Sequence, residues 1–157
     1  MDTLTQANRG VELCRAGEWQ KGLILLAEVP NSELSDRRLR ALSYSYLGYG
    51  IAKFQRQARQ GIKLCEQAVS IELCEPEVFL NLVRTRVMIN DRRGAVAAVK
   101  RGLQYHPEHP VLTEYLRKLG IRRQPVLPFL SRGNLLNRIL GQLRFQWSGI
   151  SNRRDLL

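Results

Sequence analysis

The placement of proline constrains the fold of this chain more than any other feature of its sequence. Within residues 1–119, proline occurs only at Pro30, Pro76, Pro107 and Pro110. Each of them lies between amphipathic segments, where the amide donor that proline lacks is not needed by a helix interior. Apolar residues recur in those segments at helical spacing, as at Ile62, Cys65 and Val69, and no stretch alternates as a strand would. The sequence therefore predicts an all-α domain.

Residues 76–107 are the clearest repeat unit in the chain. A helix is expected to begin at the first proline, with a turn at Asn90-Asp91 after it. A second helix should then carry small residues at Ala95 and Gly102 before the closing proline ends it. This pattern resembles the tetratricopeptide repeat (TPR), a 34-residue helix–turn–helix unit. The resemblance implies a right-handed superhelical solenoid of stacked helix pairs, and the alternative is a bundle of helices around one axis.

The TPR resemblance extends over most of the chain. It implies units at about 3–35, 36–75 and 76–109, followed by a cap helix at 110–119 and a C-terminal extension at 120–157. In the first unit, Gly10 takes the position where the two helices cross, and Gly22 takes the first small position of the second helix. The early proline at position 30 predicts that this second helix is short.

The middle unit departs from the repeat length. It spans 40 residues, six more than the period, and the excess near residues 48–59 predicts a lengthened turn or longer helices there. Ser32 or Ser35 is expected to cap its first helix. The residues that match the family pattern are Leu39, Leu42, Ser43 and Tyr46 in the first helix and Gly61 and Ala68 in the second.

In the resembling family, the first helices of successive units line a concave groove that holds a partner segment. Carried over position by position, the groove residues are Asn8, Val11 and Arg15, then Arg37, Arg40 and Tyr44, then Asn81, Arg84 and Met88. No carboxylate is expected among them. Because arginine binds carboxylates through two parallel hydrogen bonds, the implied guest is an acidic segment or a C-terminal carboxylate. The alternative is that these arginines are merely solvated.

Positive charge is concentrated at the C-terminal end of the chain. The net charge is +11; residues 1–116 hold 16 basic and 13 acidic residues, whereas residues 117–157 hold nine basic residues and one acidic residue. Such a segment favours an acidic partner, which could be a protein surface, anionic lipid or nucleic acid. The alternative is a basic tail that only aids solubility.

Residues 134–147 within this tail have the pattern of an amphipathic helix. Its apolar stripe consists of Leu135, Leu136, Ile139, Leu140, Leu143 and Trp147. Three interpretations remain open. The stripe folds back on the repeats, docks on another subunit or partner, or lies on an anionic membrane surface.

No catalytic or cofactor-binding motif is present in the sequence, so we expect no enzyme activity and no cofactor. His106 and His109 share one turn but lack a third ligand, which argues against a metal site. The three cysteines, at positions 14, 65 and 74, have no CxxC spacing and are expected to be unpaired thiols in a reducing compartment.

These observations predict a cytoplasmic, non-catalytic scaffold or adaptor that binds an acidic peptide or protein partner in the groove. The tail would serve as a lid, dimer contact or docking element, and a homo-oligomer stays open. No small-molecule substrate is expected. The alternative function is a peripheral membrane adaptor at the inner face of a membrane, or a nucleic-acid-binding protein, acting through the basic tail.

Overall fold

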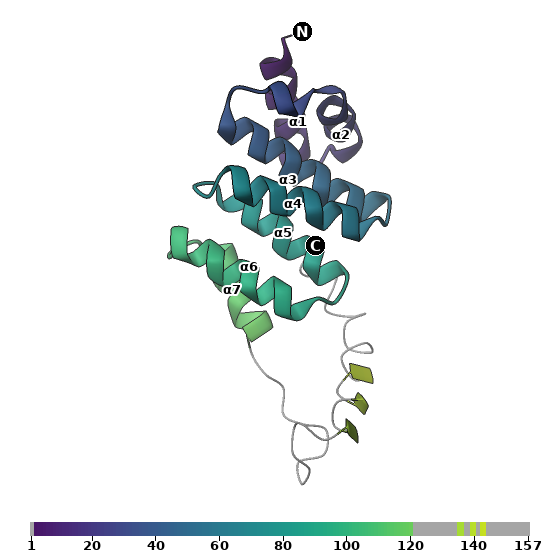
Figure 1. Cartoon of the computed structure of the whole chain (residues 1–157), viewed down its shortest axis with the longest axis vertical. Coiled ribbons are helices and arrows are strands. Elements are labelled where there is room, and N and C mark those ends of the chain that lie inside the picture. The colour runs from purple at the N-terminus through teal and green to yellow at the C-terminus, as the bar shows by residue number, and fades with distance from the viewer. Residues whose placement is uncertain (1, 121–134, 137–138, 141, 144–157) are drawn as a thin grey trace. The chain divides into compact units, whose positions relative to one another are not determined.

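The structure is a computed structural model that describes residues 2–120, 135–136, 139–140 and 142–143. The chain divides into two units, residues 1–120 and residues 121–157. In the first unit the elements are α1 (Thr3–Arg15), α2 (Trp19–Glu28), η1 (Asn31–Glu33), α3 (Arg37–Phe54), α4 (Ala58–Ile71), α5 (Pro76–Met88), α6 (Arg92–Tyr105) and α7 (Pro110–Gly120) (Figure 1). No strand occurs among the described residues, and the predicted all-α class is confirmed.

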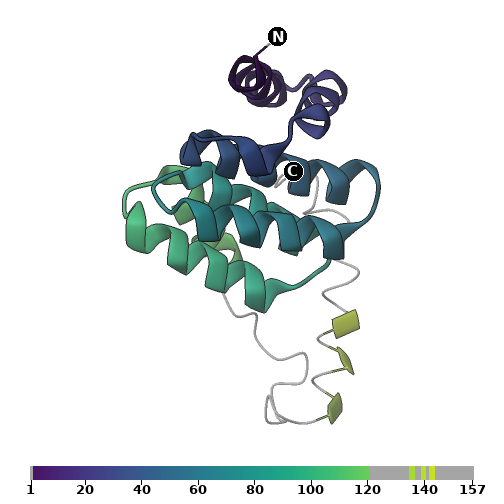
Figure 2. The same cartoon turned by 45° about the horizontal axis from the view of Figure 1, so that its top comes forward.

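Helices that follow one another in the sequence pack as pairs within this unit. α1 packs on α2, α3 on α4 and α5 on α6, while α7 covers α6 (Figures 1 and 2). α3 also packs against α1, α2 and α5, and α5 also packs against α4. The first helix of each later pair therefore joins that pair to the pair before it.

Local sequence signals set the ends of the third pair. Pro76 stands in the first turn of α5, where its missing amide hydrogen is not needed. Asn90 adopts the left-handed conformation with φ of 60° and reverses the chain after α5. The Asp91 carboxylate then accepts a hydrogen bond of 2.8 Å from the amide of Gly94 and caps α6.

The helices of each pair cross where one of them carries glycine. A β-carbon on Gly22 would lie 2.8 Å from the carbonyl oxygen of Gly10, and one on Gly48 would lie 2.6 Å from the carbonyl oxygen of Gly61. In the third pair, a β-carbon on Gly102 would lie 3.0 Å from the side chain of Phe79. Any side chain at Gly22 or Gly48 would separate the two backbones, so these glycines fix how the paired helices are seated.

The crossing in the second pair corrects the predicted register of that unit. Ser43 is the small residue among those expected to match the repeat in the first helix, but Gly48, five residues later, makes the close contact with α4. α3 has 18 residues and α1 has 13, and most of the difference lies at the start of α3. The prediction of a longer helix is confirmed, whereas its placement near residues 48–59 is wrong.

The start of α3 also differs from the predicted cap. Asp36, rather than Ser32 or Ser35, accepts a hydrogen bond of 3.0 Å from the amide of Leu39. The short second helix predicted for the first unit is confirmed, because α2 has ten residues and ends before Pro30.

The two candidate crossing residues of α3 give opposite mutational predictions. Gly48→Ala should cost about 1–3 kcal/mol of unfolding free energy, because its methyl group would meet the backbone of α4. Ser43→Ala should be neutral or slightly stabilising, since this buried hydroxyl has no hydrogen-bond partner among the described residues. Urea unfolding followed by circular dichroism measures both variants. A larger loss at Ser43 than at Gly48 would contradict the register.

Candidate functional site

The crossing residues identify which side chains occupy equivalent positions on the first helices. Asn8, Val11 and Arg15 lie two residues before, one after and five after Gly10. The same offsets from Gly48 in α3 lead to Tyr46, Tyr49 and Lys53. In α5 the resemblance to the repeat places Val83, which is fully buried, at the crossing position, and the same offsets from it lead to Asn81, Arg84 and Met88. We call the side of α1, α3 and α5 that carries these nine positions the first-helix face.

Arg37, Arg40 and Tyr44 lie on another side of α3 than the first-helix face, so their place in the groove stays a prediction that this register does not support. At 3.6 residues per turn, Arg40 lies about 180° around α3 from Tyr49. Arg37 donates a hydrogen bond of 2.8 Å to the carbonyl of Ile71 at the end of α4. The Nε atom of Arg40 is buried and has no hydrogen-bond partner among the described residues.

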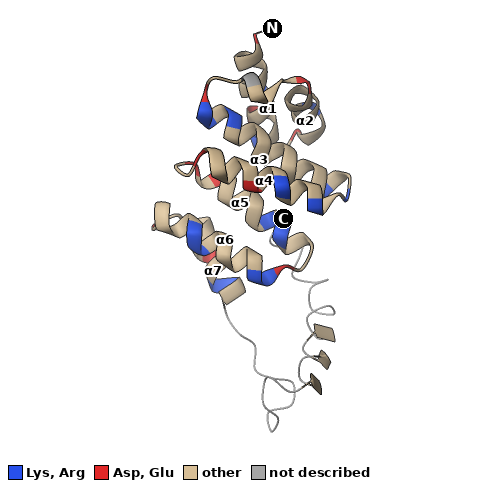
Figure 3. Cartoon of the chain, viewed as in Figure 1, with Lys and Arg blue, Asp and Glu red and all other residues tan. Residues whose placement is uncertain are grey.

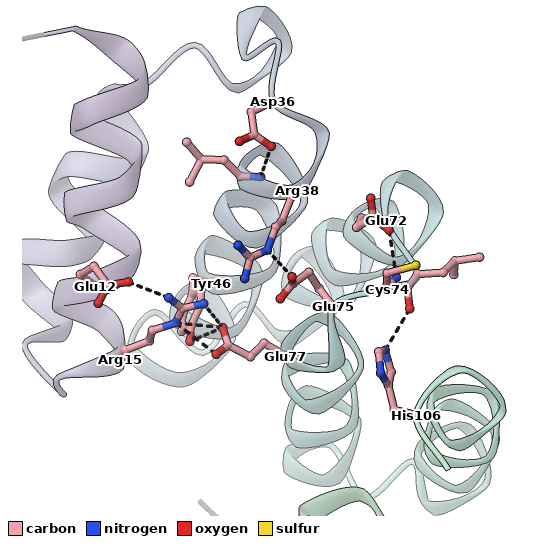
Figure 4. A network of polar contacts seen from close by, with 12 residues as sticks. Glu12, Arg15, Asp36, Arg38, Tyr46, Glu72, Cys74, Glu75, Glu77 and His106 are labelled. Atoms are coloured by element: carbon pink, nitrogen blue, oxygen red, sulfur yellow. Dashed lines mark hydrogen bonds and ion pairs between the residues drawn. The ribbon is translucent and has the colours of Figure 1, made fainter. Parts of the chain in front are cut away.

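Arg15 is held by two carboxylates of the chain itself, Glu12 and Glu77, which are not among the predicted groove residues (Figure 4). Its Nε and Nη2 atoms donate to both oxygens of Glu77 at 3.0–3.2 Å, and Nη1 donates to Glu12 at 2.6 Å. Tyr46 donates a hydrogen bond of 2.9 Å to the same Glu77 carboxylate. These contacts link α1, α3 and α5, so Arg15 connects the three pairs.

Burial and the Glu77 charge set the protonation of this cluster. Burial raises the pKa of Tyr46 above its ordinary value, and the negative charge of Glu77 raises it further. For Arg15, burial opposes the charged form, but the hydrogen bonds and charge of Glu77 prevail and raise the pKa of the guanidinium. Tyr46 therefore stays a hydrogen-bond donor and Arg15 stays a cation at any physiological pH.

A second group of cations lies around the ring of Tyr49. The Nζ atom of Lys53 is 5.4 Å from the ring centroid and donates a hydrogen bond of 3.3 Å to the Tyr49 hydroxyl. The guanidinium carbon of Arg84 is 5.8 Å from the same centroid. Neither cation has an ion-pair partner in the part of the chain that the structure describes. The rings of Trp19 and Phe54 also lie 5.7–5.8 Å from the Lys53 ammonium. The positive charges here are therefore stabilised by cation–π contacts with aromatic rings in place of ion pairs with carboxylates.

Asn81 is buried, so a partner cannot contact it, and it holds Arg84 through a hydrogen bond. It is 1% exposed, its amide donates a hydrogen bond of 3.0 Å to Ser45 of α3, and its oxygen accepts one of 3.2 Å from Arg84. Burial raises the pKa of Tyr115 in α7, and the positive charge of the nearby Arg84 lowers it in part. The Nε atom of Arg84 is buried and has no acceptor among the described residues.

The other predicted groove residues have mixed positions. Asn8 is exposed and Met88 is half-buried one turn beyond Arg84, whereas Val11 is 2% exposed in the core between α1, α2 and α3. The sequence did not lead to the prediction that Tyr46, Tyr49 and Lys53 lie on this face. The signal that could have found them is Gly48, which precedes Gly61 by almost the same interval as Gly10 precedes Gly22.

The predicted docking residues of the tail are described only in part. Leu135, Leu136, Ile139 and Leu143 are 45–66% exposed and Leu140 is less so, while Trp147 lies outside the described residues. Their docking role stays a prediction.

Neither a metal site nor a membrane-spanning helix is found among the described residues. No group of three metal-ligating side chains occurs there, and no helix there is long and apolar enough to cross a bilayer. His106 lies 3.1 Å from the carbonyl of Leu73, and His109 accepts a hydrogen bond from the amide of Leu112 at 3.3 Å. Lys and Arg occur on α3, α4, α6 and α7 with fewer acidic residues between them (Figure 3).

Comparisons with known proteins identify the fold. No sequence family and no curated protein match this chain. A solved structure described as the Hsp90 co-chaperone Cns1 from Saccharomyces cerevisiae (delta69) is similar, with a TM-score of 0.64 and 14% identity. The match covers 98% of this chain and 45% of that chain, so this chain spans less than half of its length. The predicted TPR-like helical-repeat fold is thereby confirmed, and membership of the TPR family itself stays a prediction.

The link between Arg15 and Glu77 can be measured by a double-mutant cycle. Arg15→Gln and Glu77→Gln should each destabilise the protein, with a coupling of about 1 kcal/mol, because both side chains are about 30% exposed and solvent screens the pair. Urea unfolding of both single variants and the double variant gives the coupling, which should fall in about 1 M salt. Additive effects of the two substitutions would show that the pair contributes nothing.

Thiol chemistry tests the burial of the cysteines. Burial raises the pKa of Cys14 to about 11 and that of Cys65 to about 12, while Cys74 is exposed. Because the thiolate is the reactive form, Ellman's reagent at about pH 8 should modify one thiol quickly in the native protein and all three after denaturation. Cys74→Ser should abolish the fast phase, and a fast phase that persists in this variant would disprove the assignment.

Proposed function

We propose that residues 2–120 form a protein-interaction module that holds an acidic segment of a partner on the first-helix face. The observation that carries this proposal is the pair of cations at Tyr49. Lys53 and Arg84 lie within 6 Å of one aromatic ring and have no carboxylate partner in the described structure. A partner carboxylate is the group that both side chains lack.

The arrangement around Tyr49 favours binding because it is preorganised. Asn81 fixes Arg84, the Tyr49 hydroxyl holds Lys53, and the Tyr49 ring is itself only 1% exposed. Side chains that are already ordered lose little entropy when a ligand arrives.

Arg15 has a different role in this proposal from the one expected from sequence. Because Glu77 and Glu12 occupy its guanidinium, Arg15 connects the helix pairs and does not bind the guest. The guest site therefore centres on α3 and α5, with Met88 as an apolar neighbour and Asn81 as its support.

The fold supports a binding role in preference to a catalytic one. The similar structure is by its description a co-chaperone, a protein that works with another protein. We infer that this chain is an adaptor without catalytic activity of its own. Its three free cysteines favour a reducing compartment, and we propose the cytoplasm.

A labelled peptide tests the proposal directly. Fluorescence anisotropy should show binding of a fluorescein-labelled hexaglutamate peptide to the full chain, with no binding of hexalysine. The double variant Lys53→Gln, Arg84→Gln should bind about tenfold more weakly or worse, because two charge-assisted hydrogen bonds are lost.

The matched control for this experiment lies on the same helix. The double variant Arg37→Gln, Arg40→Gln also removes two positive charges, but from the opposite side of α3, and should bind within about twofold of the original chain. Equal losses in both double variants would mean that only net charge attracts the peptide, and the site would then be rejected.

A further inference from the structure

A cleft of about 340 Å³ lies on the opposite side of α5 from Arg84. It is bounded by α4 and α6, which both pack on α5. Its lining residues are Glu66 and Val69 from α4, Phe79, Leu82 and Arg86 from α5, and Gly94, Ala97, Ala98 and Arg101 from α6. This volume is in the range of sites that enclose part of a small ligand or a large side chain.

The floor of this cleft is apolar and firmly held. Val69, Phe79 and Leu82 are 0–6% exposed, so their positions are set by the core. α6 contributes Ala97 and Ala98, whose small side chains leave the space open. An apolar side chain entering here would exchange water for contacts with fixed apolar walls.

The rim of the cleft carries charged groups of both signs, and Arg101 is the lining cation that has no ion pair in the described structure. The two terminal nitrogens of Arg86 donate hydrogen bonds, one to Asp91 at 2.5 Å and the other to Glu66. The Nε atom of Arg86 is buried and has no acceptor among the described residues. Gly94 makes room for this pair, since a β-carbon there would collide with Arg86. Arg101 is exposed and has no ion pair in the described structure.

We propose that this cleft is a second binding site, which takes a large apolar side chain adjoining a carboxylate from a segment of a partner protein. The apolar group would rest on Phe79 and Leu82, and the carboxylate would pair with Arg101 at the rim. Charge complementarity selects this occupant. The chain's own residues 134–147 carry arginine and no acidic residue, and would be repelled by Arg101. The site is independent of the first-helix face, because Leu82 and Arg84 lie about 200° apart around α5.

The smallest probe of this chemistry is N-acetyl-phenylalanine, which has an aromatic ring beside a carboxylate. Titrated into the ¹⁵N-labelled full chain, it should shift backbone amide signals of residues 79–86 and 94–101 in a saturable manner. N-acetyl-phenylalaninamide, which lacks the charge, should bind about tenfold more weakly, equivalent to about 1.4 kcal/mol.

Two variants and their controls locate the site. Ala97→Trp should fill the cleft and abolish the shifts, whereas Gln104→Trp, an equally large change on an exposed α6 residue outside the cleft, should not. Arg101→Glu should weaken binding about tenfold or more, and Arg93→Glu, an exposed α6 residue that does not line the cleft, should leave it within about twofold.

The spectra of the unliganded variants show whether each one is folded. If Ala97→Trp does not fold, Arg101→Glu tests the proposal. Shifts centred on Lys53 and Arg84, equal affinity for the amide, or unchanged binding by folded Ala97→Trp or Arg101→Glu would each overturn the proposal. So would the absence of saturable shifts.

Discussion

The close crossing of backbones at glycine is the constraint on which the arrangement of this protein depends. Where α3 meets α4, Gly48 and Gly61 leave no space for a β-carbon, and the same is true of Gly22 against Gly10. A contact between backbones fixes the rotation of each helix as well as its distance. The identity of the side chains that face outward, including those of the first-helix face, follows from that rotation.

Arg15 and Lys53 occupy equivalent positions on this face but make different contacts, because only Arg15 lies within reach of the Glu77 carboxylate. Arg15 lies beside Glu77, and the ion pair uses its hydrogen-bonding capacity inside the fold. Lys53 occupies the corresponding position in α3, has no such neighbour in the described structure and rests on aromatic rings. A cation over a ring gains about 0.5–2 kcal/mol and keeps most of its donors free. A basic residue at this position thus stabilises the fold in the first pair, as Arg15, and keeps donors free for a ligand in the second pair, as Lys53.

The sequence could predict the helix pairs and their approximate limits, because proline positions and apolar periodicity are local signals. Pro76, the turn at Asn90-Asp91 and the early Pro30 all coincide with helix ends in the structure. It could not predict the register of α3, because two amphipathic frames fit this long helix. Leu39, Leu42 and Tyr46 do pack into the core, which made Ser43 a credible crossing residue, but α4 selects Gly48. The predicted residues Arg37, Arg40 and Tyr44 stand nine residues before Tyr46, Tyr49 and Lys53, which places them about half a turn away around α3.

The partners of the arginines were equally beyond sequence reasoning, since they come from distant parts of the chain. Glu77 is 62 residues from Arg15, and no local pattern links them. Burial of Asn81 likewise depends on Ser45 across the interface between α3 and α5. Residue type alone could identify an arginine-rich face, whereas only the packing separates an arginine that is already paired from one that is not.

The register of the helices also accounts for the charged groups at the edge of the cleft beside α5. Counted from the crossing residues, Phe79 corresponds to Tyr44 of α3, and Arg86 corresponds to Ile51. Ile51 is half-buried and offers no charge, whereas Arg86 draws Glu66 and Asp91 around the end of the cleft. The residue three positions after the crossing therefore decides whether charged groups gather on this side of the helix.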